Sequence, residues 1–126
     1  MLESAGLIAF VAVKDLDRAR EFYEGILGLR LVREDGFALV FDAQGTLLRV
    51  TQVDQVEVVP YTVLGWNCDD VAIAVAGLAG HGVSTERFES LGQDTLGIWT
   101  SPSGDLVAWF KDPDGNTLSL TQPAHL

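Results

Sequence analysis

The feature that most constrains the fold is a repeat, because the two halves of the chain carry predicted elements in the same order. In the first half, an apolar run at 7–13 precedes a helical pattern at 16–27. The second half opens with a strand-like run at 61–68 and a helical pattern after Asp70. Strand-like segments follow both helices, at 29–34, 37–42 and 46–53 in the first half and at 83–88, 96–100, 105–111 and 117–122 in the second. We therefore expect an α+β protein built of two βαβββ modules.

Superposing the halves tests the repeat. Asp15 and Asp70, each suited to cap a helix N-terminus, are 55 positions apart, and 48–52 (LRVTQ) matches 118–122 (LSLTQ) at an offset of 70. Most of the difference between these two offsets comes from a longer stretch in the second half, at 89–104. The alternative is a chance match of two short segments. The repeat predicts a single domain over 1–126, with modules at 5–53 and 61–123 and a connector at 54–60.

Composition restricts the partners. The chain has 18 acidic and 8 basic residues, a net charge of −10, and the basic residues form no cluster. Such a field repels phosphate backbones and anionic lipid, so we expect no nucleic-acid or membrane partner. The single cysteine, Cys68, cannot form an internal disulfide, and the first residues lack the basic region of a secretory signal. These features favour a cytoplasmic location, and we expect Cys68 to be buried and inert.

Three features together resemble the vicinal oxygen chelate superfamily, which includes glyoxalase I, bleomycin-resistance proteins and extradiol dioxygenases. They are the sequences VKDL, REFY and ILGL within 13–29, the FKDPDGN turn at 110–116, and the internal duplication. The resemblance covers nearly the whole chain. It implies two βαβββ modules whose sheets curl into an open barrel-like cup with the helices outside. Many members are homodimers, and we expect one here.

The resemblance also locates the four positions that hold a metal ion in other members, two in each module. Their usual ligands are His, Gln or Glu, whereas the residues here are Ile8, Arg49, Val63 and Ser119. Isoleucine and valine offer no donor atom, and an arginine cation repels a divalent ion. The two histidines, His81 in a Gly-His-Gly helix stop and His125 in the tail, do not fall on an inward strand. We therefore expect no metal or other cofactor.

Strand alternation extends these positions into a list of cup residues. Phe10 shares the face of Ile8, Leu47 and Thr51 share that of Arg49, and Thr117 shares that of Ser119, while Val11, Val13, Leu48 and Val50 face the helix. Trp99, Trp109, Phe37 and Phe41 are candidates to complete the walls, the alternative being that these rings form ordinary core. The predicted ligand-binding set is Ile8, Phe10, Leu47, Arg49, Val63, Trp99, Trp109, Thr117 and Ser119.

Arg49 is the most distinctive of these residues. A guanidinium in a sparsely polar cup can grip a carboxylate, phosphate or carbonyl of a ligand. The alternatives are an internal ion pair with one of the acidic residues or a position in solvent. The stretch 89–104 is either a lid over the cup or a plain hairpin that extends the sheet.

The leading hypothesis is a metal-independent protein that binds or sequesters an organic molecule. This ligand is hydrophobic or aromatic, and one form of the hypothesis gives it a negative charge. An enzyme of the same superfamily with an altered site, a lyase, isomerase or dioxygenase, is the alternative, and a purely structural domain is a third. Metal-dependent glyoxalase or dioxygenase chemistry is disfavoured by the four ligand positions. No Asp, Glu or His falls on the inward list to act as a general base. The sequence leaves the identity of the ligand open.

Overall fold

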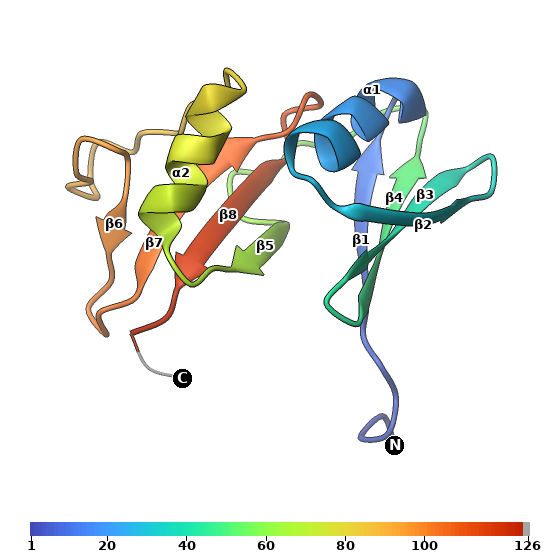
Figure 1. Cartoon of the computed structure of the whole chain (residues 1–126), viewed down its shortest axis with the longest axis horizontal. Helices are drawn as coiled ribbons and strands as arrows, with labels where there is room; N and C mark the ends of the chain where they lie inside the picture. Colours follow the sequence, from blue (N-terminus) through green and yellow to red (C-terminus); the bar gives the residue numbers. More distant parts are fainter. Residues whose placement is uncertain (125–126) are drawn as a thin grey trace. The chain divides into compact units, whose positions relative to one another are not determined.

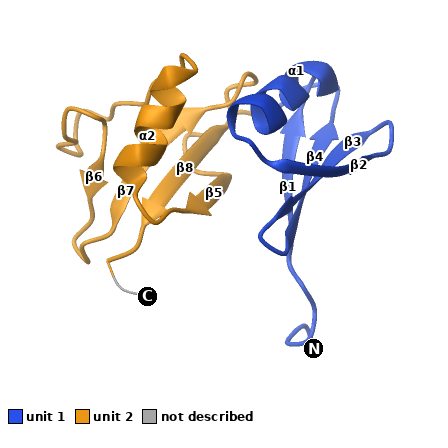
Figure 2. Cartoon of the chain, in the orientation of Figure 1, with its two compact units in different colours: residues 1–57 blue, residues 58–126 orange. Residues whose placement is uncertain are grey.

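The structure, a computed structural model, describes residues 1–124, so the predicted tail histidine His125 lies outside the described residues. Two compact units make up the chain, and they divide between Glu57 and Val58, inside the predicted connector (Figure 2). Unit 1 contains β1 (Ile8–Val13), α1 (Leu16–Arg20), η1 (Glu21–Ile26), β2 (Arg30–Glu34), β3 (Ala38–Ala43) and β4 (Thr46–Gln52). Unit 2 contains β5 (Leu64–Asn67), α2 (Val71–Gly80), β6 (Trp99–Thr100), β7 (Leu106–Lys111) and β8 (Thr117–Gln122).

Each unit is an open four-stranded sheet with its helix over one face (Figure 1). The strand orders are β1-β4-β3-β2 and β5-β8-β7-β6. In both units the strand before the helix runs parallel to the last strand of the unit, and the remaining pairs are antiparallel. The predicted α+β fold of two βαβββ-type modules is therefore confirmed.

The helix of unit 1 begins and ends as the sequence predicts. Asp15 is the N-cap, and its carboxylate accepts hydrogen bonds from the backbone N–H groups of Asp17 and Arg18 at 2.9 and 3.1 Å. After α1 the helix widens into the π-helical segment η1, where the Leu27 N–H donates to the Phe22 carbonyl at 2.9 Å. Gly28, at a φ of 71°, then ends the helix in a left-handed conformation.

Burial in unit 1 follows the predicted alternation. The helix-facing residues Val11, Val13, Leu48 and Val50 are buried, and together with Ala19, Phe22 and Tyr23 of the helix they form the core. Phe41 belongs to this core and not to the cup, which is the alternative that the sequence left open for the aromatic rings. Its ring is fully buried 6.3 Å from that of Tyr23, because Phe41 pairs with Leu48 on the helix side of the sheet.

In unit 2 the same construction places α2 over β7 and β8. Asp70 is the N-cap of α2, and its carboxylate accepts from the N–H groups of Ala72 and Ile73 at 3.0 and 3.2 Å. His81 is the C-cap residue, as the Gly-His-Gly stop predicts. On this helix-facing side the rings of Trp66 and Phe110 stack with centroids 6.2 Å apart.

One predicted strand of unit 2 does not form. The segment 83–88 is irregular, and its link to the sheet is a hydrogen bond from the Glu86 N–H to the Trp109 carbonyl at 2.7 Å. The β6 strand that pairs with β7 contains only Trp99 and Thr100. Side chains in 85–94 form hydrogen bonds with nearby backbone groups and so compete with the hydrogen bonds of a regular β-ladder.

None of the helices within residues 1–124 has the length and apolar character to cross a membrane.

Candidate functional site

The best candidate site is a hollow of about 470 Å³ that lies wholly within unit 2. It opens on the face of the sheet opposite α2, since Trp109, Lys111 and Thr117 belong to the alternate set from the helix-facing Ala108, Phe110 and Leu118. Its lining residues come from the start of the unit, from the irregular segment after α2, and from β7 and β8. They are Pro60, Tyr61, Thr62, Glu86, Phe88, Leu91, Trp109, Lys111 and Thr117.

Aromatic rings dominate the walls of this hollow. The rings of Phe88 and Trp109 meet edge to face, with centroids 5.3 Å apart and planes at 85°. Trp99, next to Trp109 across the sheet, has its ring centroid 5.9 Å away. The indole Nε1–H of Trp109 donates to the Thr62 hydroxyl at 3.2 Å, which fixes the orientation of the indole. Two perpendicular ring faces of this kind suit a flat apolar molecule.

Two charged side chains also line the hollow. Glu86 lies two residues before Phe88, so the two side chains leave the segment on the same side, while Arg87 between them donates to the carbonyls of Asp94 and Thr95. Lys111 follows Trp109 by two on β7, and its Nζ lies 3.4 Å from the Gly115 carbonyl.

The segment 84–98 forms one wall of the hollow, and side-chain hydrogen bonds within it hold it in place, so we call it the pinned segment. Gln93 links three backbone groups, because its amide nitrogen donates to the carbonyls of Glu86 and Gly97 at 2.9 and 2.8 Å and its oxygen accepts from the Phe88 N–H at 2.7 Å. The Asp94 carboxylate accepts from two more N–H groups within the segment. These bonds hold Glu86 and Phe88 at the hollow, and the hairpin 99–107 continues the sheet beyond it.

Of the predicted site residues in unit 2, Trp109 and Thr117 line the hollow and Trp99 contacts Trp109. Ser119, paired with Trp109 across the sheet, is buried beneath the next strand, since a Cβ built on Gly65 would lie 2.7 Å from the Ser119 Oγ. Val63 is exposed, and its N–H donates to the Thr117 carbonyl at 2.9 Å.

The predicted residues of unit 1 share one face of its sheet. Ile8 pairs with Leu47 and Phe10 pairs with Arg49 across β1 and β4, so all four side chains project from the side away from the helix. Ile8 and Phe10 are exposed there, Phe10 to 61%. Phe37 lies outside β3 and is also exposed.

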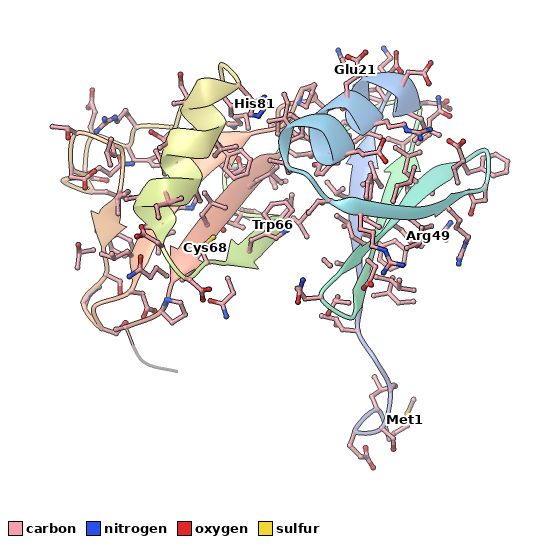
Figure 3. All side chains as sticks on the ribbon, viewed as in Figure 1. Met1, Glu21, Arg49, Trp66, Cys68 and His81 are labelled. Atoms are coloured by element: carbon pink, nitrogen blue, oxygen red, sulfur yellow. The ribbon has the colours of Figure 1, made fainter. Side chains whose placement is uncertain are left out.

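Arg49 forms the internal ion pair that was the alternative to ligand contact. Its Nη2 donates to an Asp35 carboxylate oxygen at 2.9 Å, and both side chains are partly exposed (Figure 3 labels Arg49). The guanidinium, and after it the N–H of Phe37, hold the pKa of the Asp35 carboxyl below its usual value.

Cys68 was predicted to be buried and inert, and the structure shows it half-buried. Burial raises the pKa of the thiol, with a smaller contribution from the charge of Asp69. A raised pKa leaves little thiolate at neutral pH.

The divalent metal that the family resemblance implies does not fit the residues present. In each unit the two family positions lie on the same sheet face, but they carry Ile8 and Arg49 in one and Val63 and Ser119 in the other. Residues 1–124 also contain no group of three or more His, Cys, Asp or Glu side chains arranged to hold a metal ion. The donor set thus offers one hydroxyl and one cation where a divalent ion needs several anionic or imidazole ligands.

Sequence reasoning missed Glu86, Phe88 and Lys111 as lining residues. The strands that carry the family's four metal positions do not include 83–88 or 105–111, so alternation from those positions does not reach these three residues. The alternation of Glu86 with Phe88, and of Trp109 with Lys111, was the signal that could have found them.

A second hollow, of about 500 Å³, lies at the N-terminus of α2 and is bordered by Asp70, Asp94 and Gln122. The polar side chains of this second hollow already form hydrogen bonds within the protein. Asp70 caps α2, the Gln122 side-chain oxygen accepts from the Val71 N–H at 3.0 Å, and Asp94 holds its own loop. The aromatic hollow is therefore the better candidate.

Comparison with known proteins agrees with this architecture. Residues 7–120 match the family described as Glyoxalase/Bleomycin resistance protein/Dioxygenase superfamily. A search of curated proteins found no match.

Several solved structures are similar over nearly their whole length. A superfamily member from Sphaerobacter thermophilus is 20% identical with a TM-score of 0.75, covering 97% of this chain and 99% of its own. A lactoylglutathione lyase from Agrobacterium tumefaciens is 19% identical with a TM-score of 0.73, covering 94% and 93%. TnmS3, an antibiotic-binding protein from a Streptomyces strain, is 26% identical with a TM-score of 0.73, covering 98% and 99%. The chain therefore belongs to the glyoxalase/bleomycin resistance protein/dioxygenase superfamily.

Proposed function

We propose that this protein binds a flat hydrophobic or aromatic organic molecule in the hollow of unit 2, without a metal ion. The observation that carries the proposal is the perpendicular pair of Phe88 and Trp109 rings on a hollow of about 470 Å³. That volume falls in the range of small-molecule sites, about 300–1,000 Å³. The similarity to an antibiotic-binding protein supports a binding role.

The energetics favour an aromatic ligand over a sugar. The rings of Phe88 and Trp109 touch each other, so a flat ligand ring that stacks on one of them and meets the other at its edge buries apolar area against both, at about 25 cal/mol per Å². The two threonine hydroxyls that line the hollow are already engaged, since Thr62 accepts from Trp109 and the Thr117 Oγ1 lies 3.4 Å from the Val59 carbonyl. A sugar would bring many hydroxyls to walls whose remaining polar side chains are those of Tyr61, Glu86 and Lys111.

Calorimetric titration with 2-naphthol tests this proposal. Wild-type protein should bind with 1:1 stoichiometry, and a chelator should leave the affinity unchanged. Phe88→Ala removes one wall and should weaken binding about tenfold, the scale of a lost aromatic contact and its buried area. Phe37→Ala, a change of the same size at an exposed residue of unit 1, is the matched control and should have no effect. Equal affinities for the two variants would contradict the assignment.

Arg49 is proposed as an anion contact on the exposed face of unit 1. Its Nη2 is held by Asp35, and the guanidinium retains further N–H donors on a half-buried side chain. Arg49→Ala should abolish the binding of an anion to this face of unit 1 and leave the binding of 2-naphthol in the hollow of unit 2 unchanged. If Arg49→Ala leaves all anion binding unchanged, Arg49 is not an anion contact.

An isomerase or lyase is the second candidate function, and Glu86 is the observation that favours it. The sequence predicted no carboxylate in the cup, but Glu86 lines the hollow and could act as a general base beside Lys111. A screen on α-ketoaldehydes and catechols, repeated with Glu86→Gln, tests this. Turnover that is lost in the variant would establish the enzyme, and no turnover would leave the binding role.

The homodimer is a further proposal and rests on family membership. Light scattering coupled to size-exclusion chromatography measures the mass directly, and twice the chain mass is the expected value.

A further inference from the structure

We infer that the ligand of the aromatic hollow is zwitterionic, with a cationic group beside Glu86 and an anionic group beside Lys111. The inference rests on the proposed function, because it names the class of molecule that the same hollow accepts. Its basis is that two opposite charges line one hollow and do not neutralise each other.

The two charges come from separate elements. Glu86 stands on the segment pinned by Gln93, and Lys111 stands at the end of β7, two residues beyond Trp109. Both are half-buried and both line the hollow that holds the rings of Phe88 and Trp109. A ligand that stacks on these rings therefore has one charge of each sign within the same cavity.

No ion pair joins Glu86 to Lys111 in the described part of the chain. The Lys111 Nζ is directed instead to the Gly115 carbonyl at the long distance of 3.4 Å. Among the described residues, the nearest cation in sequence to Glu86 is Arg87, which is committed to the carbonyls of Asp94 and Thr95. Each charge in the hollow thus keeps capacity for a ligand group of opposite sign.

A ligand with both charges satisfies the hollow better than the simpler alternatives. A neutral aromatic molecule would displace water from Glu86 and Lys111 and leave both without a partner, which costs free energy. A molecule with a single charge would satisfy one side chain and be repelled by the other. The net charge of −10 attracts the cationic end during approach.

Four naphthalene compounds separate these cases, because they share one ring system and differ in charge. They are 2-naphthol (neutral), 2-naphthylmethylamine (cationic), 2-naphthoate (anionic) and 3-(2-naphthyl)alanine (zwitterionic). At neutral pH, calorimetry with wild-type protein should show the zwitterion binding about tenfold tighter than 2-naphthol, the scale of one net charge-assisted contact.

The variants assign each charge to its partner. Glu86→Gln should reduce the affinity for the amine and the zwitterion about tenfold without weakening 2-naphthol, and Lys111→Met should do the same for the carboxylate and the zwitterion. Glu89→Gln, an exposed residue three positions further along the same segment, is the matched control for Glu86 and should change nothing. Melting curves without ligand verify that each variant folds.

The outcomes separate this inference from the function on which it rests. If 2-naphthol binds and the zwitterion binds no better, the inference is overturned and the aromatic site stands. A zwitterion preference that survives both Glu86→Gln and Lys111→Met also overturns it. If none of the four compounds binds, the proposed function fails and takes the inference with it.

Discussion

Replacing Gly97 by alanine tests whether the pinned segment 84–98 holds the wall of the hollow. Gly97 is buried, has a φ of +85°, and lies directly against Thr85. A Cβ at this position would lie 2.2 Å from the Thr85 Oγ1 and 2.8 Å from its Cβ, so Thr85 must move. That hydroxyl now donates to the Leu96 carbonyl at 2.8 Å, a bond that the movement would break.

The magnitude follows from a matched pair of variants. Gly92→Ala pays the left-handed backbone cost of about 1–2 kcal/mol, because Gly92 has a φ of +62° and open space around it. Gly97→Ala has the same backbone cost and adds an overpacking cost of about 1–3 kcal/mol and the loss of a hydrogen bond, about 1 kcal/mol. The free energy of unfolding of unit 2 should therefore fall by about 2–4 kcal/mol more in Gly97→Ala than in Gly92→Ala.

Tryptophan emission during urea unfolding is the appropriate assay, since Trp66, Trp99 and Trp109 all lie in unit 2 and report on it alone. Adding Thr85→Ala to Gly97→Ala removes the 2.2 Å contact and should restore part of the loss. Equal stabilities for Gly97→Ala and Gly92→Ala would refute the close contact with Thr85. So would the absence of any rescue by Thr85→Ala.

Three further predictions concern other parts of the chain. Asp35→Asn should destabilise the protein at pH 7, and the difference should become smaller below about pH 4, because the pKa of the folded carboxyl is lowered and its stabilising effect is lost as the pH falls through that pKa. Urea unfolding of both proteins at pH 7 and pH 3 checks this, and an equal difference at both pH values would contradict it. Phe41→Ala should cost about 3–5 kcal/mol of unfolding free energy, against less than about 0.5 kcal/mol for the exposed Phe37→Ala, and similar costs would place Phe41 outside the core. The Cys68 thiol should react with a disulfide reagent more slowly than free cysteine at pH 8, and faster reaction would contradict its raised pKa.

The sequence predicted the parts of the fold that depend on local chemistry and burial. Asp15 and Asp70 cap helices because a carboxylate at that position meets free N–H groups, whatever the tertiary structure. The face of β4 was predictable because Leu48 and Val50 must be buried, which leaves Arg49 on the other side.

The sequence did not predict how segment 83–98 folds. Its alternating pattern suggested a strand at 83–88, but Gln93 and Asp94 bond to backbone groups of their own segment and replace the ladder. Such bonds depend on where a side chain falls after the chain has turned, and residue type does not specify this. The sequence left open whether Phe41 lies in the core or in the cup, because residues 37–41 (FALVF) are apolar throughout and show no alternation.

The indole N–H resonances give the most direct test of the aromatic hollow. The three tryptophans of the chain give three separate signals in a ¹⁵N correlation spectrum. Trp109 lines the hollow, whereas Trp66 stacks on Phe110 on the opposite face of the sheet. Titration with 3-(2-naphthyl)alanine in the presence of a chelator should move the Trp109 signal and leave that of Trp66 in place. A shift of Trp66 alone, equal shifts of both, or binding that the chelator abolishes would contradict a metal-independent aromatic site in unit 2.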